Sequence, residues 1–250
     1  MRRLVTPAIV LRTIVYGDSD RVVTLLTRDH GKLTAIARGA RKSVKRFGAG
    51  LGLFGIGEAV VSERNSDSGA EMGTLERFDA RSGFPEILQD VIKVAHGGYA
   101  SELVRELSPA RQPEPRVFDL LVAFLERLSH GAPRVERLRA FELALLDAVG
   151  LRPEILRCIG CDSEPEAGFF DVVRGGLICA NCHHGGAGDF LLEAPVLEAF
   201  RRLQREGDDE SRPLGAGENR SMRQALGAVI LGHVGRPLKS LEFIHKMNQA

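Results

Sequence analysis

The chain has 250 residues, of which 44% are hydrophobic and 27% charged, and its formal net charge at pH 7 is +1. This composition is typical of a folded globular protein and excludes a chain that is disordered throughout. No stretch reaches the roughly 18 consecutive apolar residues of a membrane span. The apolar run after Met1 contains Arg12 and has no small-residue cleavage site. It therefore does not predict a signal peptide, and we expect a cytoplasmic protein that does not bind membranes.

The small net charge hides a strong asymmetry along the chain. Residues 1–50 contain eleven Lys or Arg and three acidic residues, a net charge of +8, which leaves −7 on the other 200 residues. Charge that is segregated in this way predicts a face that binds a polyanion, the alternative being a solvated basic surface without a partner.

In chain order, the first elements are strands. Runs of β-branched residues separated by turn residues predict about five strands, at 5–16, 21–27, 32–37, 58–63 and 71–78. Asp18 and Asp20 fall in the first turn, and a turn role is the simplest reading of both. Five short strands in some eighty residues predict a small closed or partly closed barrel. The OB-fold is the commonest such barrel among nucleic-acid-binding proteins.

From residue 85 onward the apolar residues recur at helical spacing. Helices are predicted at 86–107, 117–128, 135–149, 195–206, 222–234 and 240–248, and the stretch 207–219 is predicted to be an exposed, mobile loop. The fold class is therefore α+β. We expect an N-terminal OB-fold barrel in 1–82, a helical domain formed by 83–150 and 191–250, and a zinc finger inserted at 151–190.

All four cysteines lie in one short stretch, as two C-x-x-C pairs: Cys158, Cys161, Cys179 and Cys182. Each pair aims two thiolates at one point, so the spacing predicts a Cys₄ site for one structural Zn²⁺. Four thiolates leave no open position for a catalytic water. Two disulfides, an iron–sulfur cluster and a thioredoxin-like redox pair are the weaker alternatives. His183 and His184 follow the last cysteine, and we expect them beside the metal site or in solvent rather than as ligands.

The segment from residue 30 to residue 57, called the basic segment here, contains no acidic residue, since Asp29 precedes it and Glu58 follows it. Clustered cations next to glycines and a serine suit phosphate contacts, which fix position without reading sequence. Aromatic residues are sparse there, so extensive base stacking is not expected. The predicted DNA-contacting residues are Lys32, Arg38, Arg41, Lys42, Lys45 and Arg46.

Catalytic motifs are not found in the sequence. The glycines at 50, 52 and 55 match G-x-G-x-x-G, but no strand precedes them and a strand pattern follows, so nucleotide binding is not predicted. Neither a G-x-S-x-G elbow nor an H-E-x-x-H helix occurs. We therefore expect a binding protein and not an enzyme.

The order of these motifs resembles the bacterial recombination mediator family RecO. The resemblance is carried by VLRTIVYGDSDRVVTLLT at 10–27, HGKLTAIARGARKSVKRF at 30–47, Phe54, the cysteine module, and RPLKSL at 236–241. It implies an OB-fold, a helical domain and a zinc finger. It also implies binding to single- and double-stranded DNA, strand annealing, and help in loading RecA. The implied partners are RecR and the acidic C-terminal tail of the single-strand-binding protein, and the implied location is the nucleoid.

Three other functions stay open on the residues alone. An OB-like barrel with a basic loop also suits an RNA-binding or translation-associated zinc-ribbon protein. The basic face could instead bind an acidic protein, which would make the chain an adaptor. A metal-dependent nuclease is the least favoured of the three.

Overall fold

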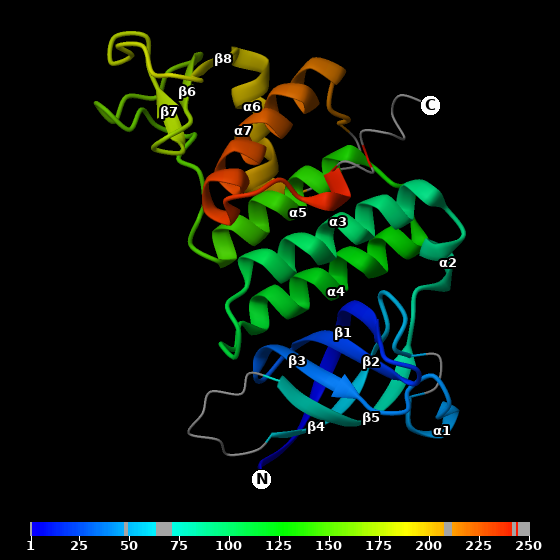
Figure 1. Ribbon diagram of the computed structural model, residues 1–250. Coiled ribbons are helices and arrows are strands. Elements are labelled where there is room, and N and C mark those ends of the chain that lie inside the picture. The colour runs from blue at the N-terminus through cyan, green and yellow to red at the C-terminus, as the bar shows by residue number, and fades with distance from the viewer. Residues whose placement is uncertain (1, 48–49, 64–71, 208–211, 242–243, 245–250) are drawn as a thin grey trace. The chain divides into compact units, whose positions relative to one another are not determined.

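The structure is a computed structural model that describes residues 2–47, 50–63, 72–207, 212–241 and 244, without the side chains of residues 44, 45 and 82 (Figure 1). Its contacts divide the chain into two compact units. The first comprises Met1–Ala132 together with Leu238–Ala250, and the second comprises Pro133–Pro237. The predicted division into barrel, helical domain and zinc finger stays a prediction.

The first unit begins with a closed barrel of five strands (Figure 1). The strands are β1 (Arg2–Tyr16), β2 (Asp20–Thr27), β3 (Gly31–Ala37), β4 (Ile56–Glu63) and β5 (Met72–Ser82). Their order around the barrel is β1-β2-β3-β5-β4, and the β3–β5 pair alone among the described pairs is parallel. All five predicted strands are therefore confirmed, with small differences at their ends.

The barrel closes around side chains that alternate along the strands. In β3 every second residue is buried, because successive side chains of a strand point to opposite faces. The short helix α1 (Val44–Phe47), which the sequence analysis does not predict, adds Phe47 to this core at 1% exposure. The same helix therefore contributes a side chain to the barrel core and carries part of the basic segment.

Three helices follow the barrel in the first unit, α2 (Pro85–Leu88), α3 (Val91–Leu107) and α4 (Pro115–His130), and residues 239–241 are also helical. The prediction of one helix at 86–107 is wrong, since the chain breaks at 89–90. Asp90 is the N-cap of α3, and its carboxylate accepts hydrogen bonds from the backbone N–H groups of Ile92 and Lys93. Near the end of the chain, the N–H of Ser240 donates to Glu102 in α3, which ties this segment to the first unit.

The second unit contains α5 (Val135–Ala148), α6 (Ala194–Glu206), α7 (Ala216–Val234), and a small sheet of β6 (Gly168–Asp171), β7 (Gly176–Ile178) and β8 (Phe190–Leu192). The helix α7 begins six residues before the predicted start, so the predicted loop at 207–219 is shorter. The reason is a capping contact: the N–H of Gly215 donates to the Glu218 carboxylate at 2.7 Å. Most of the helix predicted at 240–248 lies outside the described residues.

None of the helices in the part of the chain that the structure describes is long and apolar enough to cross a membrane.

Candidate nucleic-acid interface and metal centre

The basic segment leaves the barrel at the end of β3 and runs through α1 (Figure 1). Of the predicted DNA contacts, Arg38, Arg41, Lys42 and Arg46 are exposed and lie within nine residues of one another. The structure thus brings these four together in a stretch named here the basic loop, residues 38–46. The side chain of Lys45, also in the basic loop, is outside the described part of the structure.

The basic loop is attached to the turn between β1 and β2. The N–H of Gly39 donates to Oδ1 of Asp20 at 2.8 Å, and the N–H of Arg41 donates to the carbonyl of Ser19 at 3.0 Å. The guanidinium of Arg41 donates to the carbonyl of Asp18 at 3.0 Å. The hydrogen bond from Gly39 lowers the pKa of the Asp20 carboxyl below its ordinary value. Asp18 lies in the turn, as expected, whereas Asp20 is the first residue of β2 and its carboxylate holds the basic loop.

Arg46 orders the basic loop from within. Its Nη2 donates to the carbonyl of Arg38 at 2.8 Å, and its Nε donates to the hydroxyl of Ser43 at 3.1 Å. Its guanidinium carbon also lies 5.0 Å from the ring centroid of Phe47. Bonds to a carbonyl and a hydroxyl fix the guanidinium without neutralising its charge.

The cations of the basic loop differ in their partners from three arginines on the strands of the barrel. On β1 and β5, Arg3, Arg77 and Arg81 each form an ion pair with a barrel carboxylate at 2.8 to 3.2 Å. Among the described residues, the basic-loop cations Arg38, Arg41, Lys42 and Arg46 have no such pair. Unpaired positive charge is therefore concentrated in the basic loop, next to the β1–β2 turn, while Arg2, Arg12 and Arg21 on the strands also have no ion pair among the described residues.

Lys32 lies apart from this group, at the opposite end of β3. Its ammonium donates to the carbonyl of Arg105 in α3, and burial lowers the pKa of its ammonium. Gly31 beside it packs against the backbone of Gln112, where an added Cβ would lie 2.1 Å from the carbonyl oxygen. This end of β3 thus packs against the helical part of the unit.

The G-x-G-x-x-G sequence lies in a loop between α1 and β4 and is followed by a strand, as the sequence analysis predicts. No helix starts there to receive a phosphate. An added Cβ at Gly55 would lie 2.0 Å from the carbonyl oxygen of Gly50, and one at Gly50 would lie 2.6 Å from Cβ of Ala80. These glycines allow the loop to pack closely onto itself and onto β5.

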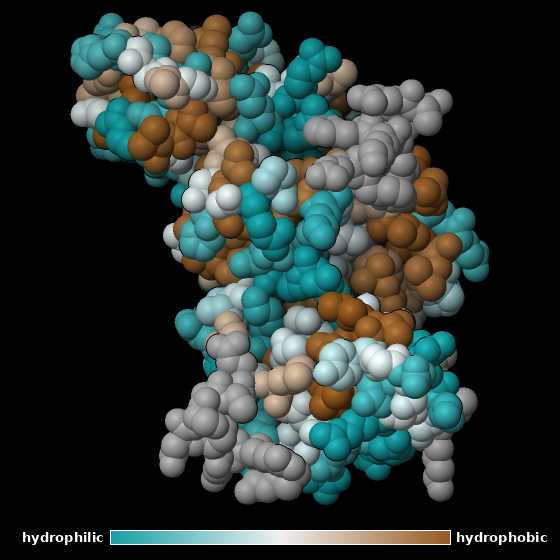
Figure 2. Space-filling view, in the orientation of Figure 1, coloured by the Kyte–Doolittle hydropathy of each residue, from teal (hydrophilic) through white to brown (hydrophobic). Residues whose placement is uncertain are grey.

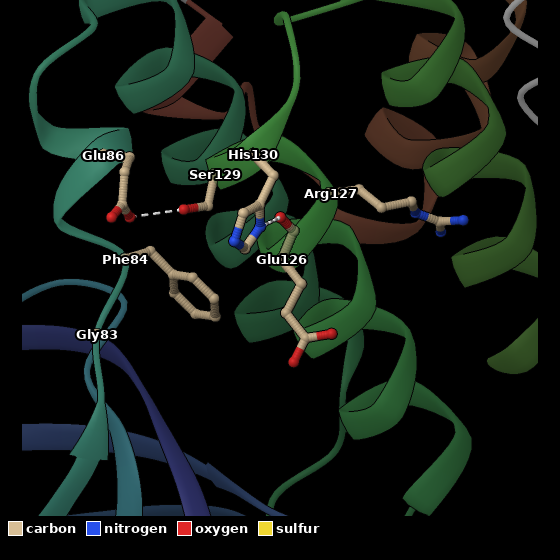
Figure 3. A pocket seen from close by; sticks show the side chains of 7 residues that line it. All are labelled: Gly83, Phe84, Glu86, Glu126, Arg127, Ser129 and His130. Carbon is tan, nitrogen blue, oxygen red and sulfur yellow. Dashed lines mark hydrogen bonds between the residues drawn. The ribbon is translucent and has the colours of Figure 1, made fainter.

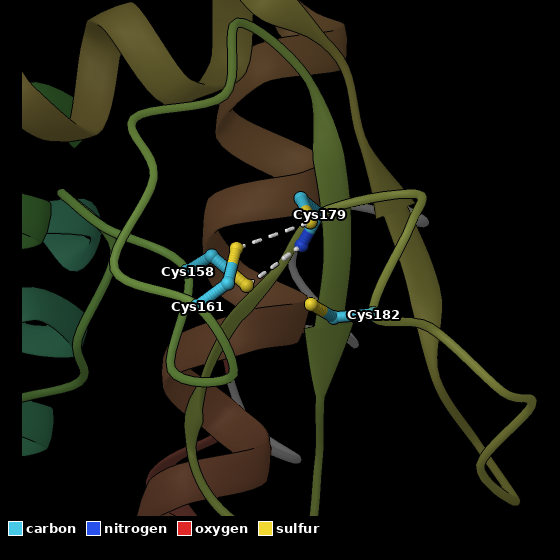
Figure 4. A group of neighbouring side chains, drawn as sticks. All are labelled: Cys158, Cys161, Cys179 and Cys182. Atoms are coloured by element: carbon cyan, nitrogen blue, oxygen red, sulfur yellow. Dashed lines mark hydrogen bonds between the residues drawn. The ribbon is translucent and has the colours of Figure 1, made fainter.

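The four cysteines form one cluster in the second unit (Figure 4). Their sulfur atoms all lie within 4.8 Å of one another, and the Sγ atoms of Cys161 and Cys179 are 3.8 Å apart. Zn–S bonds of about 2.3 Å in a tetrahedron place sulfur atoms about 3.8 Å apart. Gly160 permits the close approach, because an added Cβ there would lie 3.0 Å from Cβ of Cys182. The donor set therefore fits a zinc ion held by all four cysteines.

Backbone amides prepare one of these thiols for the anionic form. Burial raises the pKa of Cys158, but N–H groups of Cys179 and Gly160, each 3.3 Å from its Sγ, contribute to lowering that pKa to about 6. The thiol of Cys182 changes in the other direction: the neighbouring cysteine side chains, Cys161 first, raise its pKa to about 12. Without a cation, one thiolate disfavours the ionisation of its neighbours. A bound metal ion would favour the thiolate form of all four cysteines, since metal ligation needs the deprotonated thiol.

His183 has partners other than the cysteines. Its ring stacks on Phe169 with centroids 3.9 Å apart and planes 8° from parallel. Its Nε2 lies 3.2 Å from the carboxylate of Asp189. This placement agrees with the expectation that His183 supports the module and is not a ligand.

A pocket of about 530 Å³ opens in the first unit at the end of α4 (Figure 3). Its lining includes Phe84, Glu86, Glu126, Arg127 and His130. A hydrogen bond from the Ser129 hydroxyl lowers the pKa of the Glu86 carboxyl. A polyanion in this pocket would meet two carboxylates, so it does not extend the basic surface. In Figure 2 hydrophobic side chains gather around α2 and the start of α3, where Leu88 of α2 and Val91 and Ile92 of α3 are exposed.

Sequence reasoning missed several contributors to these sites. Ser163 places its hydroxyl 3.2 Å from the Sγ of Cys161, and Gly39 supplies the N–H that Asp20 holds. The Gly39 contact depends on how two loops meet, and Ser163 lies two residues beyond Cys161, outside the C-x-x-C pattern itself.

Family models cover nearly all of this architecture. Residues 1–84 match the family described as "Recombination protein O N terminal", and residues 88–242 match "Recombination protein O C terminal". The barrel with its basic loop and the helical region with its cysteine cluster thus define a protein of DNA recombination and repair.

Curated relatives narrow this class to one family. The chain is 41% identical to "DNA repair protein RecO" of Anaeromyxobacter sp. (strain K) over 99% of this chain and 98% of the relative. It is 37% identical to the protein of that name from Myxococcus xanthus, over 98% of both chains. The same name belongs to a relative in Geobacter sulfurreducens that is 36% identical over 96% of both chains. The chain belongs to the RecO family of DNA repair proteins, which confirms the resemblance.

Proposed function

We propose that this protein binds single- and double-stranded DNA without sequence preference, anneals complementary strands, and mediates recombinational repair without being an enzyme. The observation that carries the proposal is the uncompensated charge of the basic loop. Four described cations lie together there with no carboxylate partner, whereas Arg3, Arg77 and Arg81 of the barrel are paired. Phosphates of DNA are the complementary ligand for such a surface.

The barrel topology supports the same proposal. We propose that the barrel is an OB-fold, because it has five strands in the order β1-β2-β3-β5-β4 and pairs β3 with β5 in parallel. OB-folds bind oligonucleotides on the face of strands 2 and 3 and with the loop between strands 1 and 2. In this chain the basic loop is bonded to that loop through Asp20 and Ser19.

Annealing follows from the charge without any chemical step. Two complementary strands repel each other through their phosphates, and a surface that binds both lowers this repulsion. Base pairing then supplies both the specificity and the free energy. No nucleophile or nucleotide hydrolysis is needed, which fits the proposed non-catalytic role.

Membership in the RecO family supports the proposed partners. They are RecR, and the acidic C-terminal tail of the single-strand-binding protein that covers the DNA before RecA is loaded. The proposed place of action is the cytoplasm, at the nucleoid. Calorimetry with purified RecR and with a tail peptide tests each partner separately, and no heat with RecR would remove it from the proposal.

The DNA proposal is tested by fluorescence anisotropy of labelled single-stranded DNA in a magnesium-free salt series. Six phosphate contacts to a single strand give log K against log salt a slope of about −4, and the five cations of the basic loop without Lys32 give about −3.5. The double variant Arg38→Gln/Lys42→Gln removes two exposed charges whose side chains form no described hydrogen bond or ion pair. We expect its slope to be smaller by about 1.4, with weaker binding to every sequence and slower annealing.

The matched control is Arg77→Gln/Arg81→Gln, which removes the same charge from residues that are ion-paired on β5. Its DNA affinity should change little. Equal loss in both double variants would remove the basic loop from the proposal. Unlabelled RNA of the same sequence tests the RNA-binding alternative, and no binding to either nucleic acid at low salt would favour an adaptor.

For the cysteine cluster we propose one structural Zn²⁺ held by Cys158, Cys161, Cys179 and Cys182. The closed set of four thiolates supports a structural role. Metal analysis of the purified protein should give one zinc per chain. The variant Cys158→Ser should lower that content, and a different metal in the untreated protein would overturn the assignment.

A further inference from the structure

The end of β1 exposes three hydrophobic residues in succession. Ile14, Val15 and Tyr16 are 42%, 60% and 59% exposed, whereas Ile9 in the same strand is fully buried. Of the two tyrosines in the chain, Tyr99 is buried and Tyr16 is not. A run of exposed apolar side chains at one place indicates a binding surface more often than chance exposure.

Strand pairing places Ile14 and Tyr16 on the outer face of the barrel. Val23 belongs to the barrel core, so its neighbour Val22 points outward. Ile14 pairs with Val22, and its side chain therefore also points outward. Tyr16 lies two residues beyond Ile14 in the same strand and pairs with Asp20, so the side chain of Tyr16 is on the same outer face. A register shift between Val10 and Arg12 precedes this pairing. Tyr16 and Ile14 thus lie side by side, outside the barrel.

The basic loop is fixed next to this apolar strip. Asp20, the partner of Tyr16 in the strand pair, holds Gly39 at 2.8 Å, and Arg41 is bonded to the turn that directly follows Tyr16. The acidic groups nearby are Asp18 and Asp20. The second is engaged by the N–H of Gly39 and the hydroxyl of Ser19. The exposed Arg12 adds a further cation along β1.

An apolar aromatic strip beside uncompensated cations matches one chemical class of ligand. A single strand of DNA presents flat apolar base faces next to phosphates, whereas a duplex hides the base faces in its stack. We propose that the ring of Tyr16, flanked by Ile14, is a stacking position for an unpaired base whose phosphates contact the basic loop. This inference rests on the proposed DNA binding and adds the preference for unpaired bases.

The test uses the fact that the chain contains no tryptophan. In the variant Tyr16→Trp, the sole tryptophan reports on its own surroundings. We expect a thymine oligonucleotide to quench this fluorescence, because the indole stacks on a base. An abasic strand of equal length, which offers phosphates alone, should bind without quenching.

The matched control is Val173→Trp. Val173 is 89% exposed in the turn between β6 and β7 of the second unit. A tryptophan there lies outside the proposed stacking position, so it measures quenching that does not come from base stacking. Its fluorescence should not change with the thymine oligonucleotide. Equal quenching of both variants, or equal quenching of Tyr16→Trp by the abasic strand, would overturn the inference.

Affinities give an independent measurement that needs no tryptophan. Tyr16→Ala should weaken single-strand binding by about 5- to 150-fold, while Tyr16→Phe keeps it and duplex binding stays within about twofold. The salt slope of Tyr16→Ala should stay as in the parent, since no charge is lost. If the parent protein binds single strands but neither tryptophan quenching nor this affinity loss occurs, the inference fails and the proposed function stands. If the parent binds no DNA, the proposed function itself fails.

Discussion

At the scale of single residues, Asp20 makes a prediction whose sign separates two explanations of DNA binding. Its carboxylate holds the basic loop through the N–H of Gly39 at 2.8 Å. If only charge mattered, Asp20→Ala would tighten DNA binding by removing a negative charge. We expect weaker binding, because the loop loses its attachment and more of its conformational freedom must be given up on binding. Anisotropy with single-stranded DNA measures the change.

The control for this variant is Asp18→Ala. Asp18 lies two residues away and contributes its backbone carbonyl to Arg41, and this bond survives the substitution. The two variants therefore remove the same charge, and only Asp20→Ala removes a described carboxylate bond. Tighter binding in both would show that the loop attachment has no effect on DNA.

The same carboxylate predicts a pH dependence. The hydrogen bond from Gly39 lowers the pKa of Asp20 below its ordinary value of 3.8. A lowered pKa means that the stabilisation is fully present above the unfolded-state value and is lost as pH falls through the folded-state value. The Gly39 amide resonance in an NMR titration should therefore stay constant from about pH 5 to 8 and move only in stronger acid. Movement near neutral pH would contradict the assigned bond.

At the scale of elements, the sequence predicts strands and helices well because their apolar periodicity is local. All five barrel strands and the cores of α3 to α7 follow from it, whereas α1 does not. The differences arise where one polar contact decides a boundary. Asp90 separates α2 from α3, and Glu218 starts α7 early through the N–H of Gly215. Both are capping patterns that can be recognised in a sequence, but helix boundaries predicted from apolar periodicity alone do not take them into account.

The junction between β3 and the segment before α4 gives a prediction about stability. Gly31 has φ +69°, and an added Cβ would lie 2.1 Å from the carbonyl oxygen of Gln112. Gly31→Ala therefore adds a backbone clash to the cost of a left-handed conformation, which alone is about 1–2 kcal/mol. We expect a loss clearly above that range in the free energy of unfolding measured with urea.

Gly17→Ala is the control for the conformational part of this cost. Gly17 has φ +58°, and nothing lies within 4 Å of an added Cβ. This variant should lose only about 1 kcal/mol. Equal losses in the two variants would show that the approach of Gln112 contributes nothing, and that β3 is not clamped at this end.

At the scale of the whole molecule, the cysteine cluster is predictable from sequence and the surface of the barrel is only partly so. Two C-x-x-C pairs define the cluster because each pair is local. The basic segment is equally visible, but its attachment through Asp20 and the outward placement of Tyr16 depend on strand register. Charge alone does not predict which cations are free to bind DNA. Lys32 has the same charge as Arg38, but its ammonium packs against α3.

The division into two units predicts that metal and DNA binding are separable. The cysteines belong to Pro133–Pro237, whereas the basic loop and Tyr16 belong to the other unit.

Structural zinc contributes about 10–16 kcal/mol to the folding of small metal modules. Extraction with a chelator should therefore lower the thermal stability of the second unit, seen as an earlier unfolding transition. The affinity for single-stranded DNA should stay unchanged, because the basic loop and Tyr16 belong to a compact unit that does not contain the cysteines. Cys158→Ser, which breaks the shell without a chelator, should behave in the same way. Loss of DNA affinity in step with zinc release, in both preparations, would place the cysteine module in the DNA-binding surface.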